Sequence, residues 1–194
     1  MEQVILASAS RVRGKLLANA GIDFQVRAAS VDESAIKFRC RNDYRSVEDT
    51  ALALAQAKAA EISDEMPGAL VIGADQILEQ DEKWFDKPRD RAEARDHLNK
   101  FSGKSHRLIT ATSIIKNANV LWHRIDSASL QVRLLDDQFI ETYLDAIGDD
   151  ALLSVGAYQL EGRGIQLFDS IDGDFFTILG LPLLPLLAFL RQRS

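Results

Sequence analysis

The sequence predicts an α/β fold, in the sense of a mixed α+β structure whose sheet is flanked by helices. Segments rich in β-branched residues intermix with Ala- and Leu-rich segments that have helical spacing. The sequence has no internal repeat, low-complexity segment or clear linker, so we expect a single domain over residues 1–194. A chain of 194 residues with 46% hydrophobic residues is long enough to bury a sizeable core.

The first half of the chain contains alternating strands and helices. Ser10 is a good N-cap for a helix that continues to about Ala20, and Gly21 is a suitable stop signal. The stretch Ser30–Asn42 is polar and mixed in charge, which predicts a loop. A second helix is expected at Val47–Ile62, and strands are expected at Val4–Ala7, Phe24–Ala28 and Ala69–Leu78.

The second half contains a long predicted hairpin and further helices. His106–Lys116 and Val120–Leu134 read as strands that are joined around Asn117–Asn119. Glycines and charged residues predict turns at Glu79–Lys83, Ser102–Lys104 and Ile171–Asp174. The other expected elements are helices at Arg91–Lys100, Asp136–Ala146 and Leu181–Arg193, and a strand at Ile165–Phe168.

Charge and cysteine content exclude several classes of function. A net charge of -6 argues against binding to a nucleic acid polymer, which requires a basic surface. The single cysteine, Cys40, excludes an internal disulfide framework and fits a cytoplasmic protein. The apolar run Ile178–Leu190 contains two prolines and is too short to span a membrane, and we expect no signal peptide. That run is expected to belong either to the core or to a homodimer interface.

The stretch L-A-S-A-S-R-V-R-G-K-L-L, Leu6–Leu17, places cations at a predicted strand-to-helix turn. The backbone N–H groups and the dipole at the start of a helix favour an anion. Ser8 and Ser10 add hydroxyl groups, and Arg11 and Arg13 add guanidinium groups that suit phosphate oxygens. The turn therefore predicts a phosphate site. The alternative is an ordinary capped helix with solvated basic side chains.

Asp75 interrupts the otherwise apolar strand V-I-G-A-D-Q-I. Burying a carboxylate is costly unless it is paired or binds a metal. Gly73 leaves room for another backbone or a ligand to approach closely. Asp75 is therefore a candidate functional residue, and the alternative is an aspartate at the strand end that bonds to a neighbouring loop.

Two lysines are candidate cations of the same site. Lys58 lies among small residues in A-Q-A-K-A, which would let another element pack close to it. Lys87 precedes Pro88, which holds it in an extended conformation. The alternative for each is a solvated surface lysine.

Several carboxylates are candidate ligands for a divalent metal. Mg²⁺ prefers oxygen ligands and often uses only one or two carboxylates together with substrate phosphates. Histidine spacing indicates no zinc site, so His97, His106 and His123 are expected to be structural or surface residues. The candidate carboxylates are Asp32, Glu33, Asp75, Glu161, Asp172 and Asp174.

The ordered motifs together resemble the Maf family of nucleotide pyrophosphatases, over nearly the whole chain. After the stretch at Leu6–Leu17 come V-D-E-S, A-Q-A-K-A, V-I-G-A-D-Q and D-K-P. These are followed by F-S-G-K-S-H-R-L-I-T-A, G-A-Y-Q-L-E-G-R-G and I-D-G-D-F-F-T-I-L-G-L-P-L. The order of the pieces makes the resemblance specific.

The resemblance implies a Maf/HAM1-like mixed α/β fold with two lobes flanking a cleft. It implies metal-dependent hydrolysis of a nucleoside triphosphate to the monophosphate and pyrophosphate, with Mg²⁺ or Mn²⁺ as cofactor. It implies Asp75 as the proton acceptor, and we expect Glu33 and Asp75 to share the metal. Whether Asp75 acts as base, ligand or both stays open. The matching positions are Ser8, Arg13, Glu33, Lys58, Asp75, Lys87 and Gln159.

Two departures bear on the nucleobase. The family's opening usually reads S-P-R-R, whereas this chain has Val12 where the first arginine is expected. Gln76 follows Asp75, where the dTTP/UTP subgroup typically has threonine, and this resembles the subgroup that acts on 7-methyl-GTP. The resemblance implies a house-cleaning activity on 7-methyl-GTP or on dTTP/UTP, and the nucleobase stays open. Gln76 or Gln159 is expected to bind a base edge or a phosphate. Two alternatives are a HAM1-like pyrophosphatase for ITP or XTP and a non-catalytic nucleotide-binding regulator of cell division.

Overall fold

The computed structural model describes residues 2–193, which form two compact units. The first unit comprises the residues up to Gln76, residues 109–126 and the chain from Phe175 on. The second unit comprises residues 77–108 and 127–174. The single domain expected over residues 1–194 stays a prediction. Within the described residues, none of the helices has the length and apolar character needed to cross a membrane.

A mixed seven-stranded sheet has the order β2-β1-β3-β5-β6-β7, and β4 pairs with β3. β1 is parallel to both β2 and β3, whereas β4 and β7 are antiparallel to β3 and β6. The predicted mixed α/β fold is thus confirmed. The strands are β1 (Val4–Leu6), β2 (Gln25–Val26), β3 (Leu70–Gln80), β4 (Lys83–Phe85), β5 (Ser105–Lys116), β6 (Asn119–Val132) and β7 (Phe168–Asp172).

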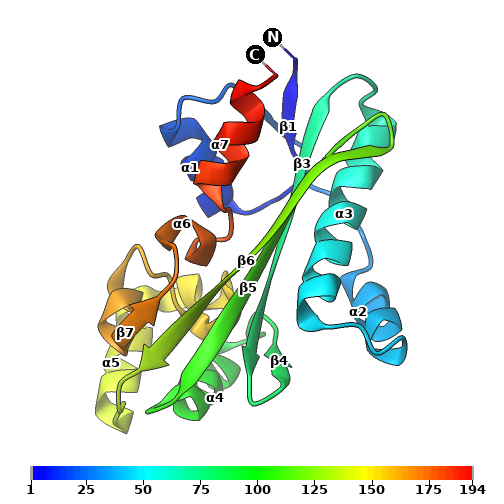
Figure 1. Ribbon diagram of the computed structural model, residues 1–194. Helices are drawn as coiled ribbons and strands as arrows, with labels where there is room; N and C mark the ends of the chain where they lie inside the picture. The colour runs from blue at the N-terminus through cyan, green and yellow to red at the C-terminus, as the bar shows by residue number, and fades with distance from the viewer. Residues whose placement is uncertain (1, 194) are drawn as a thin grey trace. The chain divides into compact units, whose positions relative to one another are not determined.

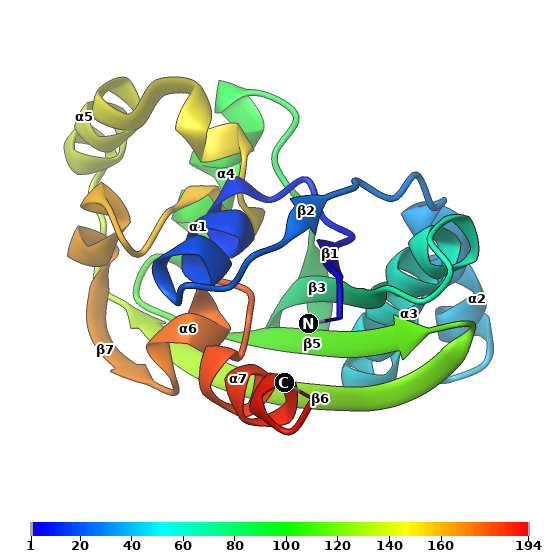
Figure 2. The ribbon, with the colours of Figure 1, turned by 90° about the horizontal axis from the view of Figure 1, so that it is seen from above.

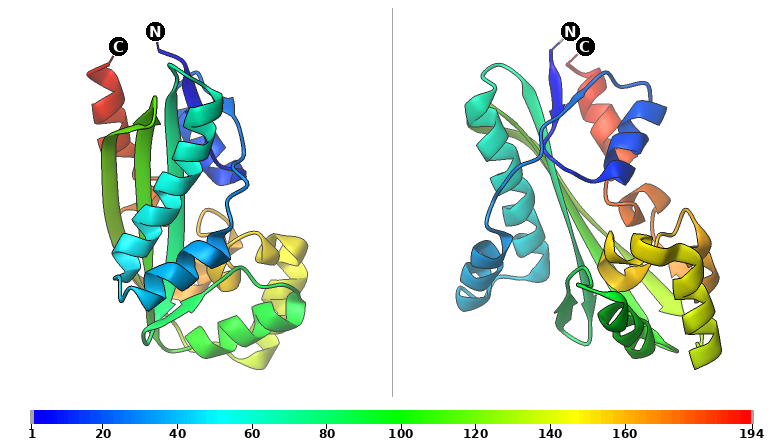
Figure 3. Two further views of the ribbon diagram at one scale, coloured as in Figure 1. Left: turned by 90° about the vertical axis from the view of Figure 1, so that its right-hand side faces the viewer. Right: turned by 180° about the vertical axis from the view of Figure 1, so that it is seen from behind.

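Helices cover both faces of the sheet in the first unit. α1 (Arg11–Asn19) and α7 (Leu183–Arg191) lie on one face, and α3 (Val47–Glu65) lies on the other, with α2 (Glu33–Asn42) beside it (Figures 1 and 3). Seen from above, β2, β1 and β3 follow one another from the edge inward (Figure 2). The short helix α6 (Phe175–Ile178) precedes α7.

The alternation of side chains along β3 decides what faces each helix layer. Leu70 and Ile72 pack in a cluster with residues of α1 and α7, whereas Val71 packs with residues of α3. Because successive strand residues point to opposite faces, Gly73 and Asp75 share the α3 face with Val71. The buried carboxylate therefore meets α3.

The region 30–42 is the clearest error of the sequence prediction, because a helix replaces most of the expected loop. α2 begins after Asp32, whose side chain accepts a hydrogen bond from the Ala35 N–H at 2.9 Å. Glu33 occupies the first turn, and Arg39 and Arg41 occupy the last, which is the charge order that the helix dipole favours. The mixed charge that suggested a loop is the charge pattern of a capped, exposed helix.

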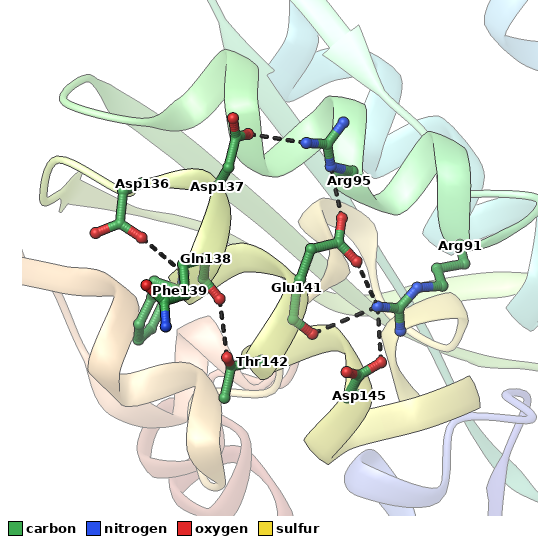
Figure 4. A network of polar contacts seen from close by, with 9 residues as sticks. All are labelled: Arg91, Arg95, Asp136, Asp137, Gln138, Phe139, Glu141, Thr142 and Asp145. Atoms are coloured by element: carbon green, nitrogen blue, oxygen red, sulfur yellow. Dashed lines mark hydrogen bonds and ion pairs between the residues drawn. The ribbon is translucent and has the colours of Figure 1, made fainter.

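The second unit contains α4 (Arg91–Phe101), α5 (Asp137–Ile147) and short 3₁₀ segments. Arg91 pairs with Glu141 and Asp145, and Arg95 pairs with Asp137 and Glu141, at 2.7–2.8 Å (Figure 4). These side chains are largely exposed, so each pair contributes little to stability. Together they link α4 to α5 at the surface.

The hairpin of β5 and β6 is confirmed, with a turn at Asn117 and Ala118. Both residues have positive φ angles, 49° and 62°. This is the geometry of the tight turn that matches the twist of paired strands. The turn between β3 and β4 has the same character at Asp81 and Glu82, with φ angles of 50° and 62°.

Several element boundaries differ from the predictions. The strand expected at Ile165–Phe168 is wrong, because Arg163–Leu167 forms a 3₁₀ helix and the strand is β7. β7 pairs with β6 as far as Asp172, so the expected turn there shortens to Gly173 and Asp174. α7 begins two residues later than expected, with Pro182 at its N-cap position, where a missing N–H costs nothing. β4 and α6 were not expected.

Candidate active site

Lys58 lies between two carboxylates in the first unit. Its Nζ donates a hydrogen bond to Asp75 Oδ1 at 2.6 Å and lies 2.7 Å from Glu33 Oε1. The Asp75 side chain is only 9% exposed and that of Lys58 12%, whereas that of Glu33 is 46% exposed. The three predicted residues therefore form one cluster, with Asp75 inside and Glu33 toward solvent.

Close packing of α3 on β3 brings Lys58 to Asp75. A Cβ atom on Gly73 would lie 2.1 Å from the Ala55 carbonyl oxygen and 2.8 Å from Ala59 Cβ. Only glycine fits there, and the small residues of A-Q-A-K-A complete the contact, as the sequence predicted. The prediction that Gly73 permits close approach by another backbone is confirmed.

Asp75 keeps one carboxylate oxygen for other partners. Oδ1 accepts from Lys58, and Oδ2 has no hydrogen-bond partner among residues 2–193. Burial raises the pKa of Asp75, and the Lys58 and Arg13 cations act in the opposite direction. The Asp75 side chain thus presents one oriented oxygen, and the Lys58 and Arg13 cations stabilise the negative charge of its carboxylate.

Arg13 is held against the middle of β3, beside the residue that precedes Asp75. Its Nη1 donates to the Ala74 carbonyl at 2.8 Å and to Ser8 Oγ at 3.1 Å, and its Nε donates to the Gly180 carbonyl at 2.8 Å. Nη2 has no partner in the described part of the chain. Burial lowers the pKa of Arg13, which nevertheless stays cationic. Nη2 is therefore a charged donor in a fixed position.

The two serines of the opening turn have different surroundings. Ser10 caps α1, because its side chain accepts from the Arg13 N–H, as predicted. Ser8 is buried, and its Oγ accepts from both Arg13 and the Ser10 N–H. The Ser8 hydroxyl hydrogen is then left to donate to a ligand. Arg11, in contrast, is exposed.

Gln76 points to the opposite face of β3 from Asp75. Its Nε2 donates to Thr110 Oγ1 at 2.8 Å, to the Thr177 carbonyl at 3.2 Å and to the Ile178 carbonyl at 3.0 Å. Since carbonyls only accept, the amide nitrogen must face them. That nitrogen is thus occupied by the protein, and the expected contact of Gln76 with substrate stays a prediction.

Two predicted site residues belong to the second unit. Lys87 is exposed in the segment between β4 and α4. Gln159 is half-buried in the glycine-rich segment before β7. Neither side chain has a hydrogen-bond partner within residues 2–193. Their predicted roles in binding substrate stay predictions.

The comparisons with known proteins identify the family. The profile described as Maf-like protein matches residues 3–193. This chain belongs to the Maf family. The Maf chain is 49% identical over 189 residues to a protein of Rhizobium meliloti named 7-methyl-GTP pyrophosphatase, covering 97% of this chain and 95% of that one. It is 48% identical over 190 residues to a protein of Paramagnetospirillum magneticum named nucleoside triphosphate pyrophosphatase, covering 98% of each.

Among solved structures, a HAM1 protein from Coxiella burnetii aligns with 68% of this Maf chain and 73% of its own, at 14% identity. The TM-score of that alignment is 0.39.

The donor set of this Maf protein fits a magnesium or manganese ion that also binds substrate phosphates. Two carboxylates, Glu33 and Asp75, converge on one cation, the ammonium of Lys58. Among the described residues, no group of three or more His, Cys, Asp or Glu side chains is arranged to hold a metal. A pair of carboxylates completed by phosphate oxygens is a usual Mg²⁺ arrangement, whereas a closed protein cage is not needed.

Sequence reasoning missed the groups that hold Arg13 and Gln76. The Gly180 carbonyl is 167 positions from Arg13 along the chain, and Thr110 belongs to β5. Both lie within motifs that carried the family resemblance, T-I-L-G-L-P and L-I-T-A, but no role was assigned to them. Gly180 has a φ of 92°, which favours glycine, and this glycine was a usable signal.

Proposed function

We propose that this Maf protein hydrolyses a nucleoside triphosphate to the monophosphate and pyrophosphate, with 7-methyl-GTP as the preferred substrate. The observation that carries the proposal is the buried Asp75, held by Lys58 at 2.6 Å beside Glu33 and the oriented Arg13. Five of the relatives that share about half of its residues are named 7-methyl-GTP pyrophosphatase. Gln76 agrees with that subgroup.

The proposed reaction begins with water that is oriented by Asp75 Oδ2. As the water oxygen bonds to the α-phosphorus, its proton passes to Oδ2, and the bond from the α-phosphorus to the bridging oxygen breaks. The electron pair of that bond leaves with pyrophosphate. Lys58 fixes the carboxylate through Oδ1 and keeps the other oxygen turned toward the water.

Charge builds on the transferred and leaving phosphate oxygens, and cations stabilise it. Arg13 Nη2 and the Ser8 hydroxyl are the donors of the first unit for this task, because the protein holds both without using them. A divalent metal on Glu33 and Asp75 would neutralise phosphate charge when bound. For Lys87 and Gln159, contact with the substrate stays the expectation that the family resemblance implies.

A panel of nucleotides tests this proposal. Purified protein with Mg²⁺ or Mn²⁺ is incubated with 7-methyl-GTP, GTP, dTTP, UTP, ITP and XTP, and pyrophosphate is measured separately from orthophosphate. We expect the highest kcat/KM for 7-methyl-GTP and no orthophosphate. Preference for ITP or XTP favours the HAM1-like alternative. Tight binding without pyrophosphate from any nucleotide favours the non-catalytic regulator and contradicts the enzyme.

A further inference from the structure

The segment Ser154–Gly164 in the second unit is held by buried side chains that the proposed chemistry does not use. We propose that His106 and Tyr158 are positioning residues that hold this segment so that Gln159 meets the nucleotide in a preformed orientation. This inference rests on the proposed nucleotide-binding function and on contacts within the second unit alone.

The backbone before Gln159 is strained and fully buried. Gly156 and Ala157 have φ angles of 83° and 61°, and Ala157 is 0% exposed. A residue with a Cβ atom rarely adopts the left-handed region, so surrounding contacts must enforce it. The Tyr143 hydroxyl does so in part, because it donates to the Ala157 carbonyl at 3.2 Å. Strained segments of this kind are concentrated at ligand-binding sites.

Tyr158 is tied to the core through its side chain and its backbone. Its hydroxyl lies 2.7 Å from His106 Nε2, and both residues are 5% exposed or less. Its ring packs edge-on against Phe168 at 4.9 Å. The Ser154 hydroxyl donates to its carbonyl oxygen. The residue next to Gln159 therefore has little freedom.

Gln159 has a fixed backbone and an uncommitted side chain. A Cβ atom on Gly164 would lie 2.4 Å from the Gln159 carbonyl oxygen, so these backbones are in close contact. The Gly162 N–H donates to the same oxygen at 3.1 Å. The side-chain amide, in contrast, is half-buried and has no partner in the described chain. A rigid backbone that presents an unpaired side-chain amide is what polar recognition of a ligand requires.

A double-mutant cycle tests the link between His106 and Gln159. Binding is measured by calorimetry with the α,β-methylene analogue of 7-methyl-GTP, which the proposed reaction does not cleave. We expect Gln159→Ala to weaken binding about tenfold, as for the loss of one good hydrogen-bonding group. His106→Leu should weaken it several-fold, and the double variant should bind no more weakly than Gln159→Ala alone.

Two further variants separate positioning from stability. His106→Gln can keep a donor near the Nε2 position and should bind within about twofold of the wild type. His97→Leu removes another buried histidine of this unit, one that packs against Phe85 and Phe101 and has no hydrogen bond to the segment. It should lower stability without changing affinity. If the losses from His106→Leu and Gln159→Ala multiply, or if His97→Leu weakens binding equally, the inference is wrong.

Hydrogen exchange decides the inference even without nucleotide binding. In His106→Leu, the amides of residues 157–160 should exchange at least about tenfold faster than in His97→Leu, because the hydroxyl anchor of Tyr158 is lost. Equal exchange in the two variants overturns the positioning role. A wild-type protein that binds no nucleotide overturns the proposed function instead, so the two failures are distinguishable.

Discussion

The contact of Gly73 with α3 makes Gly73→Ala the most informative substitution. The new Cβ atom would lie 2.1 Å from the Ala55 carbonyl oxygen, more than 1 Å inside ordinary contact, and 2.8 Å from the Ala59 backbone nitrogen. Both are backbone atoms, which cannot rotate away as a flexible side chain could. β3 and α3 must therefore separate by about 1 Å, and Lys58 must move away from Asp75 with its helix. Overpacking of this kind costs about 1–3 kcal/mol.

That cost lowers the Tm by about 2–4 °C per kcal/mol in a protein of this size. Displacement of the Lys58–Asp75 pair by about 1 Å should lower kcat/KM about a hundredfold. Differential scanning calorimetry and the pyrophosphate assay measure the two effects. Gly14→Ala, in α1, is the matched control, because its new Cβ atom would make only an ordinary van der Waals contact with the Phe24 ring at 3.9 Å. A Gly73→Ala protein with unchanged Tm and unchanged activity refutes the reasoning.

Three further predictions concern other residues. Burial lowers the pKa of His106 from 6.5 to about 4. Between these two pH values, the imidazole is protonated in the unfolded chain but stays neutral in the folded protein. Stability should fall between about pH 6.5 and pH 4, by about 3 kcal/mol in all, and this part of the pH dependence should vanish in His106→Gln, as followed by urea unfolding. Gln76→Leu leaves the Thr177 and Ile178 carbonyls without that donor, and should cost about 1–3 kcal/mol in the same assay and raise KM. Asp75→Asn should lower kcat by about two to four decades while the far-UV spectrum stays unchanged.

The sequence predicted the members of the cluster better than their arrangement. A carboxylate in an apolar strand identified Asp75, and small neighbours identified Lys58, because each pattern is local. Their contact depends on how α3 packs on β3, which no local pattern specifies. Glu33 shows the limit most clearly. It was expected to bind a metal from a loop, whereas it lies in the first turn of a helix.

Residues whose partners are distant in the chain were the least predictable. The surroundings of Gln76 are Thr110, Thr177 and Ile178, and those of Arg13 include Gly180. The sequence shows that Gly180 can adopt a positive φ, but it does not show that its carbonyl binds Arg13. The β7 strand was placed too early because Ile165 and Leu167 are apolar. They belong to a 3₁₀ helix that ends where pairing with β6 begins.

The position of the oxygen that water donates tests the central claim most directly. Hydrolysis of 7-methyl-GTP is carried out in ¹⁸O-labelled water, and the ¹⁸O content of both products is measured by mass spectrometry. The account predicts one ¹⁸O atom in the monophosphate and none in pyrophosphate, because water attacks the α-phosphorus. Label in pyrophosphate, or release of orthophosphate in its place, would contradict it.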